Sequence, residues 1–262
     1  MQLDEFVRDV ARGAGKIVKE KFHAPKTVRS KSAPGDVVTE VDEESERYIV
    51  ERIRSEYPND CILSEECGSI GGVCCENMWI IDPIDGTRNY ATQVPFFCVS
   101  IGLAHNGKAE MGAIFDPIHD EMFFAQRGAG AYLNGGRIEV SEQDSFEDAI
   151  ISVSWVKRRT DRAKFLRYIE ELSHDTSYFR RFGSAALVMS YLASGRVHAY
   201  IQGGLNPWDV AAGIVLIEEA GGTVTDFAGN PIDLQNADIE IATANPKLHS
   251  FLLDRVIRSG MG

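Results

Sequence analysis

The sequence predicts a mixed α+β and α/β fold in which helices cover β-sheets. In the N-terminal part, apolar residues at helical spacing precede strand-like segments that are separated by Gly, Asn, Asp and Pro turns. In the C-terminal part, strand-like and helical segments alternate, which indicates α/β layering. A chain of 262 residues can bury a substantial core as one large layered domain or as two closely packed ones.

Two amphipathic helices are predicted near the N-terminus. The first has apolar residues at helical spacing from Leu3 to Phe22. The second is expected to begin near Thr39, because Thr39 and Asp42 have the spacing of a capping box, and to end before Pro58.

The remaining elements follow in chain order. Strands are predicted at 78–81, 96–104, 111–115, 121–125, 149–153, 177–181 and 199–201, and helices at 161–172, 184–193 and 209–220. The glycine-rich segment 128–136 favours a hairpin over a dinucleotide site, because it has no complete GxGxxG and no helical pattern follows it. The polar stretch 141–148 is the expected boundary between two halves, residues 1–143 and 144–262.

The most informative motif is Asp82-Pro83-Ile84-Asp85-Gly86-Thr87, which directly follows an apolar run. Two ionised carboxylates at the end of a buried strand repel each other, and a bound divalent cation allows both to stay charged. Gly86 permits close approach of a ligand, and Thr87 can open a helix whose first N–H groups receive phosphate oxygens. An ordinary turn also suits this sequence, so the motif needs support from elsewhere.

Two other acidic clusters supply that support. The apolar run that begins at Cys61 ends in Glu65 and Glu66, and Asp209 follows Pro207 at the start of a small-residue helix. An acid at a helix start is also favoured by the helix dipole alone. Surface carboxylates have no reason to begin or end apolar elements at three places, so the clusters together predict one shared cation site.

These residues resemble the inositol monophosphatase family. It belongs to the lithium-sensitive, magnesium-dependent phosphatase superfamily that also holds fructose-1,6-bisphosphatases and 3'-phosphoadenosine nucleotidases. Asp82-Pro83-Ile84-Asp85-Gly86-Thr87 and Trp208-Asp209-Val210-Ala211-Ala212-Gly213 look like its two signatures in order and separation, and 35–42 resembles a shorter element. The resemblance implies a layered α-β-α-β-α sandwich. It also implies hydrolysis of inositol 1-phosphate and related sugar or polyol phosphates by metal-activated water.

The resemblance also implies roles for individual residues. Two or three Mg²⁺ ions per subunit are expected on Glu65, Asp82, the Ile84 carbonyl, Asp85 and Asp209, and the implied catalytic groups are Asp42, Glu65 and Thr87. Asp42 and Thr87 would activate the attacking water together. The expected substrate contacts are Asp85, Gly86, Thr87, Ala185, Gln202 and Asp209.

Three further positions carry open alternatives. Lys31 is expected to add positive charge beside the phosphate, although an exposed lysine is more often only solvated, and Glu66 is expected to act beside the cluster through water. Gln202 stands where the family commonly has a glutamate that receives hydrogen bonds from inositol hydroxyls. The other interpretation of Gln202 is a polar residue at a strand end.

The substrate is the main open question. Fructose-1,6-bisphosphatase, histidinol-phosphate phosphatase and 3'-nucleotide phosphatase are alternatives within the superfamily. The segment Arg181-Phe182-Gly183-Ser184-Ala185-Ala186 favours the inositol type, whereas Arg88 after Thr87 is less typical of it. A serine-based triad is not expected, because no serine lies in a nucleophile elbow. A non-catalytic regulatory protein on the same fold is a different class of hypothesis, and the full acidic set argues against it.

The composition limits which binding partners and which cellular compartment we expect. The net charge of −12, without a basic stripe, disfavours nucleic acid as the main partner. The N-terminus has no basic segment followed by an apolar one, and no run is long enough to span a bilayer, so a cytoplasmic protein without membrane contact is expected. The family is usually dimeric, so a homodimer is expected.

The cysteines are expected to be reduced thiols. There are five, Cys61, Cys67, Cys74, Cys75 and Cys98, in a large chain without a secretion signal. Cys67, Cys74 and Cys75 include no CxxC pair and have no nearby histidine, which disfavours zinc. The segment 68–73 is expected to be a surface loop whose neighbouring thiols can be oxidised.

Overall fold

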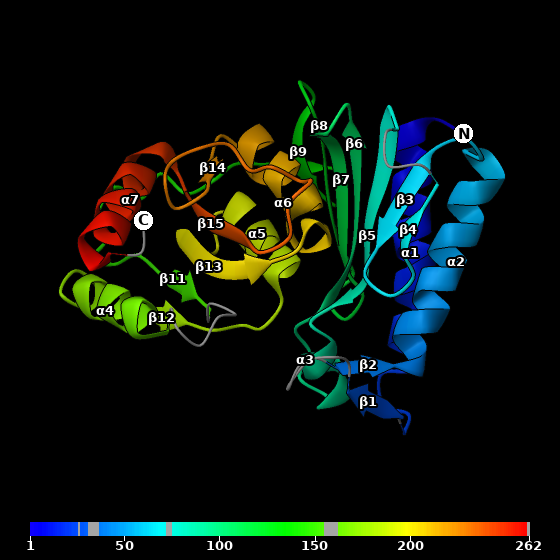
Figure 1. The fold of residues 1–262 in the computed structure, drawn as a ribbon, viewed down its shortest axis with the longest axis horizontal. Helices are drawn as coiled ribbons and strands as arrows, with labels where there is room; N and C mark the ends of the chain where they lie inside the picture. Colours follow the sequence, from blue (N-terminus) through cyan, green and yellow to red (C-terminus); the bar gives the residue numbers. More distant parts are fainter. Residues whose placement is uncertain (26, 31–36, 72–74, 155–161, 261–262) are drawn as a thin grey trace.

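Helices and sheets alternate as layers across the molecule (Figure 1). The structure is a computed structural model that describes the whole chain except residues 26, 31–36, 72–74, 155–161 and 261–262. One pair of helices covers the outer face of an eight-stranded sheet, a second pair lies between this sheet and a five-stranded sheet, and a third pair covers the far side of the smaller sheet. In that order the helices are α1 (Leu3–Glu20), α2 (Glu40–Glu56), α5 (Ala185–Ala193), α6 (Pro207–Glu219), α4 (Arg162–Ser173) and α7 (Pro246–Ser259). The layering confirms the predicted α-β-α-β-α sandwich.

The large sheet has the strand order β10-β9-β8-β7-β6-β5-β3-β4, in which β3 and β5 run parallel and the other neighbours run antiparallel. Because β3 and β5 are parallel neighbours, their carboxyl ends meet at one edge of the sheet. The predicted strands and the hairpin at 128–136 are confirmed, with boundaries shifted by a few residues. The strands are β3 (Cys61–Ser64), β4 (Gly68–Ile70), β5 (Asn77–Asp85), β6 (Cys98–His105), β7 (Lys108–Asp116), β8 (Glu121–Gln126), β9 (Gly130–Leu133) and β10 (Gly136–Ile138).

The small sheet has the order β12-β11-β13-β15-β14 and is also mixed. The sequence did not predict β14 or β15, nor the hairpin of β1 and β2. Three-residue strands carry too little periodicity to be recognised, although the alternating Ile239 and Ile241 were a usable signal for β15. The bounds are β1 (Val28–Ser30), β2 (Val37–Thr39), β11 (Ile151–Val153), β12 (Phe179–Arg180), β13 (Ala199–Leu205), β14 (Thr223–Thr225) and β15 (Ile239–Ala244).

The two predicted N-terminal helices are confirmed. The apolar stripe of α1, which includes Phe6, Val10 and Val18, is buried against the large sheet. The capping box predicted at the start of α2 is present, because the Thr39 backbone N–H donates to the Asp42 carboxylate at 2.9 Å. The cap therefore places a buried carboxylate at the start of α2.

Helix α6 packs unusually close to the large sheet. A Cβ atom added at Gly112 on β7 would lie 2.5 Å from the carbonyl oxygen of Ala212, and one at Gly102 on β6 would lie 2.9 Å from the Cβ of Ala211. Only glycine fits at these two strand positions, since no side chain can occupy that space. The contact fixes the height of α6 above the strands.

The hydrophobic core is shared between the two expected halves. Ile80 and Ile114 of the large sheet belong to the same buried cluster as Leu187 and Val215 of the C-terminal part. The chain passes from the large sheet to the small one between residues 138 and 151, and a division at 143/144 stays a prediction. Among the described helices, none combines the length and apolar composition that a bilayer crossing requires.

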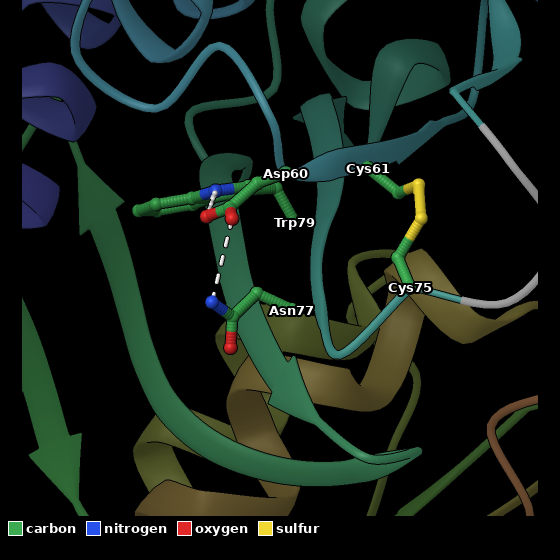
Figure 2. Close-up of a disulfide and its surroundings, with 5 residues drawn as sticks. All are labelled: Asp60, Cys61, Cys75, Asn77 and Trp79. Atoms are coloured by element: carbon green, nitrogen blue, oxygen red, sulfur yellow. Dashed lines mark hydrogen bonds between the residues drawn. A yellow bond between two sulfur atoms is a disulfide. The ribbon is translucent and has the colours of Figure 1, made fainter.

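The structure corrects two expectations about the cysteine-rich segment. Residues 68–70 form the edge strand β4 on β3 rather than a loop. Cys61 and Cys75 form a disulfide, as Figure 2 shows, so the expectation of reduced thiols is wrong for this pair, and Cys75 is not free to ligate zinc. Cys61 begins β3 and Cys75 precedes the parallel strand β5, which brings their Cα atoms to 5.9 Å, within the range that a disulfide requires. The sequence alone does not show that Cys61 and Cys75 lie close together.

A second link holds the same end of the two strands. The indole N–H of Trp79 donates to the Asp60 carboxylate at 3.0 Å, and the Asn77 amide donates to it at 3.3 Å (Figure 2). Asp60 precedes β3, whereas Asn77 and Trp79 lie on β5. The pairing of β3 with β5 therefore does not depend on the disulfide alone.

Removal of the disulfide is expected to lower the free energy of unfolding by about 2–4 kcal/mol, because a cross-link spanning about 15 residues restricts the unfolded chain. The variant is Cys61→Ser with Cys75→Ser, and urea denaturation in oxidising buffer measures the change. Cys67→Ser, at an exposed free thiol, is the control and should shift stability by less than about 0.5 kcal/mol. Equal stability of the double variant and the wild type would contradict the prediction.

Candidate active site

Three aspartates converge where β5 meets α6. One carboxylate oxygen from each of Asp82, Asp85 and Asp209 lies within 4.8 Å of the others. Asp82 and Asp85 lie at the carboxyl end of β5 and are 2% and 6% exposed, whereas Asp209 lies in the first turn of α6. The structure thus brings together residues that are more than a hundred positions apart in the sequence.

A bulge in β5 sets the spacing of the first two aspartates. Asp82 pairs with Ser100 of β6 and Asp85 pairs with Cys98, so three steps along β5 face two steps along β6. Pro83 lies in the bulge, where its missing backbone N–H removes no hydrogen bond between the strands. The extra residue re-aims the end of the strand, and both carboxylates are buried in one place.

Burial and mutual repulsion make the ionised cluster costly. The pKa of Asp82 is raised well above its ordinary value, first by burial and then by the charges of Glu65, Asp85 and Asp209. Burial also raises the pKa of Asp85 to about 6, although hydrogen bonds to its carboxylate oppose the shift. A set of carboxylate oxygens in this state fits a hard divalent cation, which would neutralise the repulsion.

Two groups at the start of α5 hold the Asp85 carboxylate. The Ser184 hydroxyl and the Ala186 backbone N–H each donate to its Oδ2 at 2.6 Å. Ala185 lies between these two donors, and its backbone opposes the rise in the pKa of Asp85. The structure therefore places Ala185, a predicted substrate contact, directly against a predicted metal ligand.

Glu65 reaches the same cluster from β3. Its backbone N–H donates to the Ile81 carbonyl of β5 at 3.2 Å, and its charge raises the pKa of Asp42, Asp82 and Asp85. The parallel pairing of β3 and β5 explains this, because both strands end at the same edge. Of Glu66, the structure shows that its backbone N–H donates to Glu46 at 3.1 Å.

Asp42 and Thr87 form a buried pair beside the cluster. The Thr87 hydroxyl lies 2.9 Å from Asp42 Oδ1 and 3.0 Å from the Ile84 carbonyl oxygen, and it can donate to either. The Thr39 hydroxyl donates to the other Asp42 oxygen at 2.6 Å. Burial raises the pKa of Asp42 from its ordinary value of 3.8 to about 6, against the effect of these hydrogen bonds.

Glycine is required between Asp85 and Thr87. Gly86 has a φ of +97°, and a Cβ atom there would lie 3.1 Å from the Phe96 carbonyl oxygen and 3.2 Å from Ser184 Cβ. Its left-handed conformation turns the chain sharply, and Thr87 begins the short helix α3 (Thr87–Ala91) as predicted. The turn leaves the Thr87 hydroxyl beside Asp42.

Gln202 lies on β13 and has one side-chain partner, Tyr200. The hydroxyl of Tyr200 donates to the Gln202 side-chain carbonyl oxygen at 2.5 Å. Tyr200 is buried, and its pKa is raised well above the ordinary value by burial and then by the charges of Asp85 and Asp209. The interpretation of Lys31 cannot be followed further, because this residue lies outside the described part of the chain.

Sequence reasoning missed three residues that organise the site: Glu46, Ser184 and Tyr200. Glu46 lies four residues after Asp42 on the buried face of α2, and this helical spacing of two acids among apolar residues was the available signal. Ser184 was recognised only as the start of a helix. No local pattern marks Tyr200, because its closeness to the charges of Asp85 and Asp209 depends on the tertiary structure.

Comparisons with known proteins identify a family to which the chain is similar. The profile of the inositol monophosphatase family matches residues 1–259. The chain is 38% identical to "Nus factor SuhB" of Vibrio cholerae over 97% of this chain and 95% of that protein. It is 36% identical to "Inositol-1-monophosphatase" of Bacillus subtilis over 98% and 97% of the two chains.

Solved structures show the same similarity. The structure of the extragenic suppressor protein suhB from Bartonella henselae matches with a TM-score of 0.91 and 32% identity, over 96% of this chain and 97% of that one. The structure of SaIMPase-II with inositol monophosphate bound matches with a TM-score of 0.82 and 28% identity, over 97% and 93%. SaIMPase-II is also known with 2'AMP bound.

We expect the metal-free protein to become less stable as the pH rises from about 4 to about 6. The folded-state pKa values of Asp42 and Asp85, each about 6, lie above the ordinary value of 3.8, so the folded state binds more protons than the unfolded state in this range. A divalent cation requires ionised carboxylates, so Mg²⁺ should raise the Tm more at about pH 7.5 than at about pH 5. Thermal denaturation with chelator or Mg²⁺ measures both effects.

The matched comparison is Asp85→Asn, which removes one of the carboxylates whose pKa is raised and should reduce the loss of stability. The same ionic strength supplied as NaCl controls for screening. An equal Mg²⁺ effect on the Tm at both pH values would contradict the prediction. So would a metal-free wild type whose stability, relative to that of Asp85→Asn, rises between about pH 4 and about pH 6.

Proposed function

The chain belongs to the inositol monophosphatase family, and we propose that it is a Mg²⁺-dependent phosphomonoesterase that hydrolyses inositol 1-phosphate and related sugar or polyol phosphates. Membership in the family supports a phosphatase of this superfamily. The identity of the substrate and of the metal is what we propose. The observation that carries the proposal is the convergence of Asp82, Asp85 and Asp209.

The residues present fit divalent metal ions. Glu65, Asp82, the Ile84 carbonyl, Asp85 and Asp209 would hold them, and two or three ions per subunit remain part of the proposal. All the donors are oxygen atoms, which Mg²⁺ prefers. When bound, such ions supply charge neutralisation on the phosphoryl oxygens and lower the pKa of water.

The Asp42 and Thr87 pair supplies a path for the proton of the attacking water. When the Thr87 hydroxyl donates to Asp42 at 2.9 Å, an oxygen lone pair of Thr87 is left to accept a proton. With a pKa of about 6, Asp42 is mainly ionised at neutral pH and accepts the Thr87 proton without a large penalty. Thr39 holds the other Asp42 oxygen, which keeps the carboxylate oriented.

The substrate would lie against the turn that follows β5. In the proposal, the backbone N–H groups of Gly86 and Thr87 contact the phosphate, and Ala185, Gln202 and Asp209 contact the alcohol part. The inositol monophosphate and 2'AMP complexes of SaIMPase-II support both a polyol phosphate and a nucleotide as candidates. Arg88, exposed beside this turn, keeps fructose bisphosphate and histidinol phosphate among the alternatives.

A regulatory role is the second candidate, and the name "Nus factor SuhB" of the Vibrio cholerae relative is the observation that favours it. Hydrolysis and regulation do not exclude each other on one chain. A protein without catalysis would not need to retain the Asp42–Thr87 pair and the aspartate cluster together. We therefore place the enzymatic role first.

The remaining expectations stay within the proposal. We propose a cytoplasmic homodimer that acts on a small phosphorylated substrate, without membrane contact and without nucleic acid as its main partner. Lithium inhibition follows from the family resemblance and belongs to the same proposal. Light scattering would test the dimer, and an activity assay in lithium chloride would test inhibition by lithium.

Phosphate release from inositol 1-phosphate should stop in chelator and return with Mg²⁺. Asp85→Asn and Asp209→Asn should each lower kcat by at least about a hundredfold, because each removes charge from an ion that stabilises the transition state. Asp148→Asn, at an exposed position outside the cluster, is the control and should keep the wild-type rate. Undiminished turnover in chelator, or normal rates in both cluster variants, would overturn the proposal.

Gln202→Glu should raise kcat/KM for inositol 1-phosphate relative to glycerol 2-phosphate. One glutamate oxygen would keep the bond from Tyr200, and the other would accept a charge-assisted bond worth about 1.5–3 kcal/mol from a substrate hydroxyl, against about 1 kcal/mol for a neutral bond. Steady-state kinetics of both substrates with both proteins give the ratio. An unchanged ratio would show that residue 202 does not contact the substrate.

A further inference from the structure

Glu46 is a buried carboxylate that has no part in the proposed chemistry. It lies on α2, is 7% exposed, and its Oε1 accepts three hydrogen bonds. The donors are the Ser64 hydroxyl, the backbone N–H of Glu66 at 3.1 Å and the backbone N–H of Cys67 at 3.0 Å. Burying a carboxylate is costly unless such bonds compensate it, so this contact is a specific feature of the fold.

The three donors lie on both sides of Glu65. Ser64 ends β3 immediately before it, and Glu66 and Cys67 follow it. The backbone of Glu65 itself is held from the other side, by its bond to the Ile81 carbonyl of β5. The turn 64–67 is therefore fixed between α2 and β5, and it carries Glu65, whose charge raises the pKa of Asp82 and Asp85.

The same helix also carries Asp42, one turn before Glu46. Residues four apart in a helix lie on one face, and here that face is buried toward the site. The capping box at Thr39 fixes the start of this helix. One rigid element thus holds both the Asp42–Thr87 pair and the turn that presents Glu65.

We propose that Glu46 is a positioning residue: it fixes the turn 64–67 so that the Glu65 carboxylate is directed at the metal ions. The inference rests on the proposed function, because it assigns Glu46 to the metal site of the same reaction. In this role Glu46 acts through Ser64 and the backbone of Glu66 and Cys67 rather than as a ligand of the metal ions. Partners that orient a metal ligand typically change metal affinity by 10–100-fold when they are removed.

A merely structural role predicts a different result. If Glu46 only stabilised the fold, its variants would lower the melting temperature and leave Mg²⁺ affinity unchanged in the folded protein. If it positions Glu65, Mg²⁺ affinity falls even where the fold is intact. Metal affinity measured independently of turnover separates the two roles.

The experiment compares Glu46→Ala, Glu46→Gln and Ser64→Ala in the full chain. Calorimetric titration with Mg²⁺ gives the affinity, phosphate release against Mg²⁺ concentration gives the half-saturating concentration and kcat, and circular dichroism gives the Tm in chelator. Glu51→Gln, at an exposed position on the same helix, is the matched control. Glutamine keeps an acceptor oxygen without the charge, so Glu46→Gln tests whether the conservative change rescues the contact.

We expect Glu46→Ala to weaken Mg²⁺ binding about 10–100-fold and Glu46→Gln and Ser64→Ala to weaken it less. Saturating Mg²⁺ should restore most of kcat in the two milder variants. The effects of Glu46→Gln and Ser64→Ala should not add, because both changes weaken the same contact between residues 46 and 64. Glu51→Gln should behave as wild type.

Wild-type Mg²⁺ affinity in folded Glu46→Gln and Ser64→Ala would overturn the inference, whatever the behaviour of Glu46→Ala. These two variants keep the test decisive if Glu46→Ala does not fold. A wild-type protein that binds Mg²⁺ but hydrolyses none of the phosphate esters would overturn the proposed function instead, and the calorimetric comparison would still decide the role of Glu46.

Discussion

The crowding of buried carboxylates at the end of β5 is the constraint on which the rest of the site depends. Asp82 and Asp85 are nearly inaccessible to solvent, and Asp209 approaches them from another element. Burial and repulsion raise the pKa of the first two, so the carboxylates by themselves oppose their own ionisation. Such a cluster suits a cation, and the surrounding structure holds the acids in place.

Different elements of the sandwich hold the acids in place. The bulge at Pro83 aims the end of β5, the start of α5 holds Asp85 through Ser184, and the capping box of α6 holds Asp209 through the Asn206 backbone N–H at 2.6 Å. Helix α6 can reach the site only because glycines on β6 and β7 let it approach the sheet closely. The site therefore depends on packing between the two sheets, although its ligands look like local motifs.

Family membership says more about the reaction of this protein than about its biological role. The family and the Bacillus subtilis relative support a phosphatase, whereas the Vibrio cholerae relative bears the name of a Nus factor. The Asp42–Thr87 pair, with its third partner Thr39, favours catalysis, because a binding protein has no use for a proton acceptor with a pKa near neutrality. In the proposed function, substrate choice depends instead on Gln202 of β13, which already accepts a hydrogen bond from Tyr200.

The sequence by itself determined the layered fold class, most helices and strands, and the acidic motifs around Asp82 and Asp209. These features depend on local periodicity, turn chemistry and capping, which neighbouring residues encode. Only the tertiary structure decided that Cys61 meets Cys75 and that Glu46 supports the Glu65 turn. It also decided which short segments become strands. These contacts join elements that are distant in the chain, and their geometry depends on strand order, register and the approach of helices, which no local pattern records.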